Sequence, residues 1–404
     1  MLLKLSDAAK KAVKLGLLCS ISYLAVYIAR NTLGAVSPKM IESGDFTTED
    51  IGALSSLFFI SYAVGQLING VIGDKIKSKI MISFGLILSG ISHLFVTVFS
   101  HSLTITFITY GLTGFFLSMI YAPMTKAVAE NTEPLFATRC CLGFTFSSFL
   151  GSPFAGILAA ILSWKIVFNT SSIILILMGI ICFFTFSIFE KKGIVKYNQF
   201  VKKEKNTNGF KILIKNRIIK FTFISVITGI IRTTVVFWMP TYLSQYLKFS
   251  PEKSALFFTV STFIISFSTF LAVFIYELLG HNMDLTILIS FSVSALCFLL
   301  VYFLKLALLN AVFMMLAILA SNCAASMLWS KYCPDLRDTG MVSSATGFLD
   351  FMSYMSASIS STLFANSVST IGWGNLILIW LALMVFGVLL ELPFNKIFKI
   401  KQNT

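Results

Sequence analysis

The sequence has 404 residues, of which 57% are hydrophobic and only 12% charged, and its formal net charge is +14. A water-soluble domain carries about 25% charged residues, so this chain lacks the side chains that would cover a soluble surface. Its apolar content also excludes an intrinsically disordered chain. Because a membrane-spanning helix with its loop takes roughly 30–35 residues, the length predicts about twelve spans.

Apolar stretches of helical length follow one another along the chain. Helices are expected because a lipid-exposed backbone must satisfy its hydrogen bonds within one segment, and the ten-residue alternation typical of membrane barrels does not occur. The predicted spans are residues 13–36, 50–72, 79–100, 103–128, 138–162, 165–189, 218–245, 253–277, 284–304, 306–330, 340–368 and 372–395. We therefore predict an all-α polytopic membrane protein with twelve transmembrane helices.

The distribution of basic residues predicts the orientation in the membrane. With the amino terminus in the cytoplasm, 24 of the 31 Lys and Arg residues fall on the cytoplasmic side and five on the other side. Cytoplasmic loops of membrane proteins carry such an excess. We expect a multi-pass protein of the cell membrane with both termini in the cytoplasm.

The longest polar interval, residues 190–217, is rich in lysine and divides the chain near its middle. We interpret it as a cytoplasmic linker between two six-helix bundles, residues 1–189 and 218–404. A weak internal repeat supports this division, because one offset of 202 residues relates Arg30 to Arg232 and Pro38 to Pro240. Parallel repeats of this kind place a transporter's binding site at the interface of its halves.

Arg30 and Arg232 are the two basic residues that remain inside predicted spans. An arginine at this depth costs on the order of 3 kcal/mol or more. Each arginine can have a structural role, paired with an acidic side chain or with helix carbonyls. Alternatively, the two guanidinium groups converge on one anion, which they suit because each forms bidentate bonds and keeps its charge. We favour the anion site, since Asp350 is the only clear acidic residue near the middle of a predicted span.

The segment between the second and third spans reads GVIGDKIKSK over residues 70–79. Gly70 permits close helix approach, and Asp74 can pair with basic groups or cap a helix end. With Lys75 and Lys79, these residues resemble the loop signature of the major facilitator superfamily. The resemblance implies contacts that hold the cytoplasmic side shut; the alternative is an ordinary charged turn.

Four further motifs resemble one branch of that superfamily, the organophosphate:phosphate antiporters. The motifs are YLAVYIARN over residues 23–31, FFISYAVG over 58–65, WMPTYL over 238–243 and GFLDFMSY over 347–354. The resemblance covers essentially the whole chain. It implies two six-helix bundles that exchange phosphate for a phosphorylated metabolite by alternating access.

The resemblance also implies roles for individual residues. Arg30 and Arg232 would bind the phosphate, while Tyr23, Tyr27 and Tyr354 would line the cavity and donate hydrogen bonds. Packing in the core or at the membrane interface is an equally good interpretation of each tyrosine.

Two departures from the family pattern concern the charge of the site. Gln66 stands where the family commonly has a lysine, and the run FTFSS over residues 144–148 lacks the histidine of the glycerol-3-phosphate transporters. The site thus lacks one fixed positive charge and one group that titrates near neutral pH. The substrate is therefore either less charged than a sugar phosphate or a carboxylate. Asp350 is interpreted as a counter-ion of Arg232 or Lys126, or as the site of a coupling proton.

These observations favour a secondary transporter of an organic anion, phosphorylated by resemblance, that works as a monomer. A membrane sensor of the same fold and a proton-coupled exporter are the alternatives. An enzyme is not expected, because cofactor loops, metal spacings and nucleophile–base pairs are missing from the sequence. We expect no cofactor, metal or nucleic-acid partner. The seven cysteines are interpreted as inert, and His93, His101 and His281 as solvated groups near helix ends.

Overall fold

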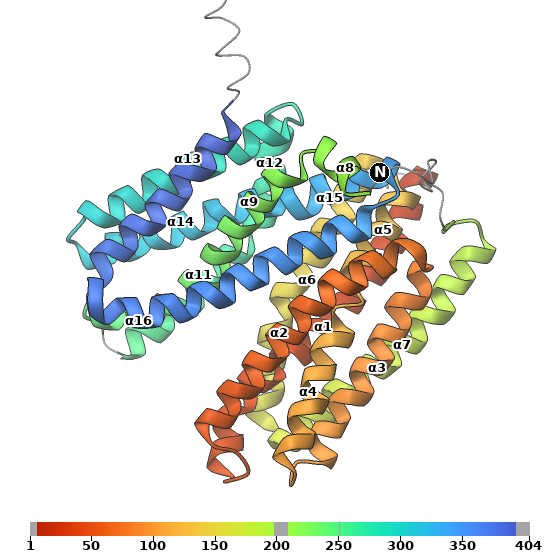
Figure 1. Ribbon diagram of the computed structural model, residues 1–404, viewed down its shortest axis with the longest axis horizontal. Coiled ribbons are helices and arrows are strands. Elements are labelled where there is room, and N and C mark those ends of the chain that lie inside the picture. The colour runs from red at the N-terminus through yellow and green to blue at the C-terminus, as the bar shows by residue number, and fades with distance from the viewer. Residues whose placement is uncertain (1–5, 198–208, 250, 393–404) are drawn as a thin grey trace, which may run out of the picture. The chain divides into compact units, whose positions relative to one another are not determined.

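The computed structural model describes residues 6–197, 209–249 and 251–392 (Figure 1). Within these ranges the chain forms helices and short connections, without strands. The first part comprises α1 (Asp7–Glu42), α2 (Thr48–Lys75), α3 (Ser78–Val98), α4 (Leu103–Leu117), α5 (Tyr121–Asn131), α6 (Pro134–Ile161), α7 (Trp164–Lys191) and α8 (Gly209–Lys215). The second comprises α9 (Ile218–Gly229), η1 (Ile230–Val235), α10 (Val236–Thr241), η2 (Tyr242–Tyr246), α11 (Pro251–Ser266), α12 (Ser268–Leu278), α13 (Met283–Phe303), α14 (Ala307–Met327), η3 (Leu328–Tyr332), α15 (Cys333–Asp335), η4 (Leu336–Thr339) and α16 (Val342–Glu391).

The all-α polytopic fold class is confirmed. Among the described residues, eleven helical segments are long and apolar enough to cross a membrane, and each overlaps one of the predicted spans. The twelfth prediction, residues 340–368, coincides with the first arm of α16. This arm is helical but contains nine serines, which lower its hydropathy, so it is missing from the eleven. Gly372 ends it with φ 74° and ψ 166°, a conformation that glycine adopts without steric cost.

The predicted seventh span, residues 218–245, differs from an unbroken α-helix. It consists of α9, the π-helical segments η1 and η2, and the short α10 between them. Only its first part, Ile218–Val235, is long and apolar enough to count as a span. π-Helical turns are frequent at functional sites, and η1 carries Arg232.

Contacts divide the chain into two compact units, Met1–Ile218 with Trp329–Met355, and Ile219–Leu328 with Ser356–Thr404. The division at residues 189 and 218 into two sequence halves stays a prediction. Residues 198–208 of the predicted linker lie outside the described residues.

In the first unit, α1 packs against α6 and α7, α2 against α4, and α3 against α4 and α7. The neighbouring helices α3 and α7 can be followed side by side in Figure 1. Two glycines without side chains permit their close approach. A Cβ added at Gly90 would lie 2.8 Å from the Ser172 carbonyl oxygen, and one added at Gly179 would lie 2.9 Å from the Ser83 carbonyl oxygen. Small residues at such contacts let membrane helices pack without a hydrophobic driving force.

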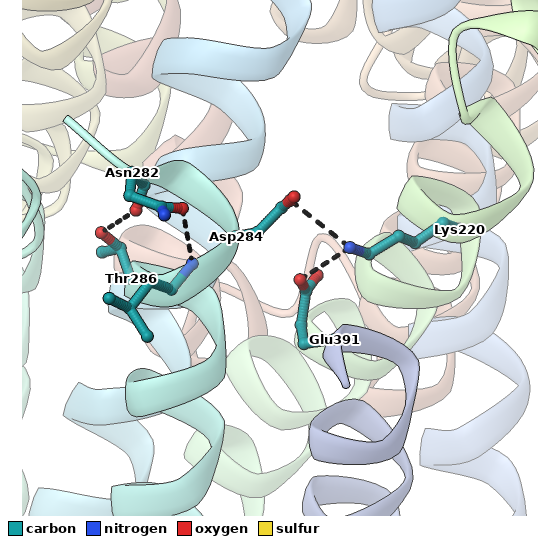
Figure 2. A network of polar contacts seen from close by, with 6 residues as sticks. Lys220, Asn282, Asp284, Thr286 and Glu391 are labelled. Carbon is teal, nitrogen blue, oxygen red and sulfur yellow. Dashed lines mark hydrogen bonds and ion pairs between the residues drawn. The ribbon is translucent and has the colours of Figure 1, made fainter. Parts of the chain in front are cut away.

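In the second unit, an ion cluster joins α9, α13 and α16 (Figure 2), with Asp284 41% exposed and Glu391 buried. Lys220 Nζ lies 2.6 Å from Glu391 Oε2 and 3.4 Å from Asp284 Oδ1. The Glu391 side chain is fully buried and that of Lys220 is 18% exposed. Beside the cluster, Asn282 caps α13 by accepting the Leu285 amide at 3.1 Å. Lys220 is one of the 24 basic residues assigned to the cytoplasmic side, and its pairing with Glu391 was not predicted from the sequence.

We expect Lys220→Met to destabilise the protein by about 3–5 kcal/mol, because removing one partner leaves the other charge buried. Adding Glu391→Leu should recover most of this loss. Lys331→Met is the matched control, since its partner Asp335 is 41% exposed and such pairs contribute about 1 kcal/mol or less. Unfolding of the purified protein in detergent measures all three; equal losses for Lys220→Met and Lys331→Met would contradict the prediction.

Candidate anion site and its closing contacts

Arg30 lies on α1 inside a cluster of aromatic rings, all within the first unit. Its guanidinium carbon is 4.7 Å from the ring centroid of Tyr62, 4.8 Å from Tyr354, 5.2 Å from Tyr27 and 5.4 Å from Phe59. Nη1 donates a hydrogen bond of 2.9 Å to the Tyr354 hydroxyl. Rings at these distances attract a cation through their negatively charged faces. The cluster therefore holds a partly buried guanidinium at a fixed position.

Tyr27 and Tyr354, both predicted site residues, lie against Arg30. Phe59 and Tyr62 contact it as well and were not among the predicted residues. Their signal was present in the FFISYAVG motif. Phe59, Tyr62 and Gln66 recur at i, i+3 and i+7, which places them on one face of α2. This spacing is the sequence signal for both rings.

Tyr23 lies one helical turn before Tyr27 on α1 and continues the aromatic cluster. Its ring centroid is 5.0 Å from that of Tyr27 and 5.2 Å from that of Tyr121 on α5. Tyr121 in turn lies 6.2 Å from Trp329. Tyr23 and Tyr121 are each only 5% exposed. Tyr23 is therefore a buried neighbour of the arginine cluster.

The helix α2 crosses the start of α16 at a pair of glycines. A Cβ on Gly70 would lie 2.9 Å from the Ser343 carbonyl oxygen and 3.0 Å from the Gly347 Cα. Nearby, the rings of Tyr62 and Tyr354 meet edge to face at 5.2 Å. The two helices thus meet over several turns, and Gly70 permits the approach.

Asp74, at the end of α2, binds the first turn of α16. Its Oδ1 accepts the Ser343 amide at 2.9 Å and its Oδ2 accepts the Ser344 amide at 2.8 Å. These amides lack intrahelical partners, and a carboxylate there also interacts favourably with the helix dipole. Asp74 therefore caps α16 from a neighbouring helix.

Lys126 completes this junction from α5. Its side chain is 3% exposed, and Nζ donates to the Gly73 carbonyl at 3.1 Å and the Asp74 carbonyl at 2.8 Å. A cation at the last carbonyls of α2 is favourable for the helix dipole. The carboxyl-terminal end of α2 is thus contacted by the Lys126 ammonium group of α5, and the Asp74 carboxylate of α2 contacts the amino-terminal end of α16.

The basic residues of the same loop have other surroundings. Lys79 Nζ lies 2.7 Å from Glu190 Oε2, and Lys77 Nζ lies 3.1 Å from Glu190 Oε1. Lys75 is exposed at the end of α2. Lys79 therefore joins α3 to α7, while Asp74 makes the contact with α16.

Two buried polar side chains belong to the same region. Gln66 on α2 is fully buried, and in the part of the chain that the structure describes neither of its amide atoms has a hydrogen-bond partner. Asp350 on α16 is 5% exposed. Both lie within the first unit, whereas Arg232 lies in the second, half-buried in η1.

The expectation that His93 is a solvated group is wrong. His93 is fully buried, and its ring stacks on Phe168 with centroids 4.5 Å apart. It lies on the face of α3 that packs against α7, which hydropathy alone does not reveal. All seven cysteines are buried and unbridged. Within the described ranges, no group of three or more His, Cys, Asp or Glu side chains has an arrangement that suits a metal ion.

These features define a polytopic membrane protein with a partly buried arginine site and a capped helix junction. Residues 19–361 match the family model of the Major Facilitator Superfamily, and the chain belongs to that family. The proton:xylose symporter XylE, a solved member, superimposes with a TM-score of 0.72 over 94% of this chain and 95% of its own. At 12% identity this likeness shows the fold alone.

Two relatives confirm the predicted resemblance to organophosphate:phosphate antiporters. The phosphoglycerate transporter protein of Salmonella typhimurium is 24% identical over 383 residues, which cover 87% of this chain and 82% of the relative. The membrane sensor protein UhpC of the same organism is 30% identical over 116 residues. That match covers 28% of this chain and about a quarter (26%) of the sensor.

Proposed function

We propose that the protein is a secondary active transporter that moves a phosphorylated organic anion across the cell membrane by alternating access, in exchange for inorganic phosphate. The observation that carries this proposal is the partly buried Arg30 guanidinium with the Tyr354 hydroxyl 2.9 Å from Nη1. A guanidinium fork and a phenol together offer an anion both charge and directed donors. The relative that transports phosphoglycerate supports a phosphate ester as the anion.

The remaining expected residues take roles around this centre. Arg232 supplies the second positive charge from the other sequence repeat, and Tyr23, Tyr27 and Gln66 complete the polar and aromatic surroundings. Asp350 acts as a counter-ion or coupling group. Gly70, Asp74, Lys75 and Lys79 close the cytoplasmic side. One chain forms the complete path, with both termini in the cytoplasm.

Alternating access gives the junction of α2 and α16 its role. A pathway that opens to one side of the membrane at a time needs contacts on each side that form when that side closes and break when it opens. The Asp74 cap is suited to this, because its two hydrogen bonds join separate helices. We propose that this cap forms in the outward-facing state.

A thermal-shift titration of the purified full chain tests the ligand class. We expect 3-phosphoglycerate, glycerol 3-phosphate or a hexose phosphate to stabilise the protein, with inorganic phosphate competing, because a ligand that binds only the folded state raises stability. Arg30→Ala should abolish the shift, while Arg139→Ala, on an exposed position of α6, should preserve it. An absence of any phosphate-dependent shift in the wild type would contradict the proposal.

The match to UhpC favours a second candidate, a membrane sensor that binds the anion without productive flux. Both candidates predict the same thermal shift. They differ in proteoliposomes, where only a transporter exchanges external labelled ester for internal phosphate. Phosphate-dependent stabilisation without exchange would favour the sensor.

A further inference from the structure

The crossing of α2 and α16 is built in layers that follow the helical repeat. At one level the ring of Tyr62 meets that of Tyr354, the partner of Arg30. Two turns further along α2, Gly70 meets Gly347. Residues four apart lie on one face of a helix. A residue halfway between Tyr62 and Gly70 on α2, and one between Gly347 and Tyr354 on α16, therefore lie between these two contacts.

The intermediate level contains Gln66 and Asp350. Gln66 lies four residues after Tyr62, and its backbone carbonyl packs against Gly347. Asp350 lies three residues after Gly347 and four before Tyr354, two residues of α16 that contact α2, so helical spacing places it on the same face. One turn of helix, a rise of about 6 Å over four residues, separates this level from the Tyr354 level.

The Gln66 amide points to a polar ligand at this level. It is fully buried, and both Oε1 and Nε2 are without hydrogen-bond partners among the described residues. A buried polar group left in this state costs about 1–3 kcal/mol. A ligand that brings a donor to Oε1 and an oxygen acceptor to Nε2 removes the cost; an ammonium group supplies the donor alone, so the acceptor must be an oxygen of the same ligand.

The Asp350 carboxylate specifies the charge of that ligand group. It is 5% exposed, and the next level along both helices holds the rings of Tyr62 and Tyr354, with centroids 5.2 Å apart. An ammonium group suits this place, because it pairs with a carboxylate and is attracted to the faces of aromatic rings.

We propose that the substrate is a zwitterion, a phosphate ester whose phosphate binds at Arg30 and whose protonated amine binds at Asp350 and Gln66. This inference rests on the proposed function and narrows its substrate class. A bridge of two or three carbon atoms spans one helical turn between the two levels. A sugar phosphate places the same phosphate charge within a turn of this carboxylate but has no ammonium group to offset the repulsion, so we expect it to bind less tightly than the zwitterion.

A matched pair of ligands tests the inference by calorimetric titration of the full chain in detergent. O-Phosphoethanolamine and propyl phosphate have nearly the same shape. The first ends in an ammonium group and the second in a methyl group. The wild type should bind O-phosphoethanolamine at least about tenfold more tightly, the size of a close charge pair. Equal affinities for the two ligands would overturn the proposal.

Two substitutions separate charge recognition from loss of folding. Asp350→Asn should remove the preference while both ligands still bind. Gln66→Lys places a positive charge beside Asp350 and should reverse the preference, a gain that a misfolded variant cannot show. The control Asp338→Asn removes a carboxylate that is 74% exposed and should leave the preference unchanged. A preference that survives in Asp350→Asn would overturn the assignment.

The remaining outcomes distinguish this inference from the proposed function. If propyl phosphate or 3-phosphoglycerate binds in an Arg30-dependent manner without preference for the amine, the zwitterion fails and the transporter stands. If propyl phosphate binding takes up a proton and Asp350→Asn abolishes that uptake, Asp350 is a proton site and the zwitterion again fails. If the wild type binds none of these phosphates, both proposals fail.

Discussion

Replacing Arg30 by lysine should lower uptake of a phosphate ester by roughly 10- to 100-fold, although the charge is kept. Lysine presents a compact point charge and loses the planar fork that bonds two oxygens at once. A charge-assisted hydrogen bond contributes about 1.5–3 kcal/mol, which sets the size of the effect. Lysine also loses the delocalised face that stacks among Tyr27, Phe59, Tyr62 and Tyr354. Initial rates of labelled ester uptake into proteoliposomes measure the loss.

The same exchange at an exposed arginine is the control. Arg139→Lys, on the exposed side of α6, should retain the wild-type rate. Phe59→Leu should give an intermediate loss, because it removes one aromatic wall and leaves the guanidinium in place. Wild-type uptake by the Arg30→Lys variant would show that Arg30 is not the anion ligand.

Replacing Asp74 by alanine should open the junction of α2 and α16 and increase the labelling of Cys333 by a maleimide about tenfold or more. The variant loses two hydrogen bonds from α16 amides to a carboxylate, and the interaction with the helix dipole is lost with them. Cys333 reports on this opening because it is fully buried in α15, which packs against α5 and α6. Asp74→Asn, which keeps an acceptor without the charge, should be intermediate.

Cys297 serves as the internal control, because it is buried on α13 in the other unit. Peptide mass spectrometry reads both sites in one sample. Equal acceleration at Cys297 would indicate general destabilisation, and unchanged labelling at Cys333 would show that Asp74 does not hold the junction closed.

Hydropathy was sufficient to predict most of the membrane architecture, because each span is a local segment that satisfies its own backbone. The exceptions have local causes. Serines in residues 342–371 lower the hydropathy of the first arm of α16, and π-helical turns interrupt the seventh predicted span. π-Helical turns have no hydropathy signature that sequence reading can use.

The candidate site was predicted in part for a similar reason. Arg30 stands out in the sequence because a charge inside a span is costly. The spacing of Phe59 and Tyr62 places them on one face of α2, but the sequence does not show that this face contacts Arg30. Lys220 and Glu391 are 171 positions apart and Asp74 and Ser343 are 269 apart, so only the fold reveals these pairs.

Counterflow in proteoliposomes loaded with inorganic phosphate tests the central claim, transport of a phosphate ester through Arg30 and Arg232, most directly. External labelled 3-phosphoglycerate or O-phosphoethanolamine should accumulate in wild-type vesicles in exchange for phosphate. Arg30→Ala and Arg232→Ala should each abolish accumulation, while Arg139→Ala should retain it. Undiminished exchange in both arginine variants would contradict the account.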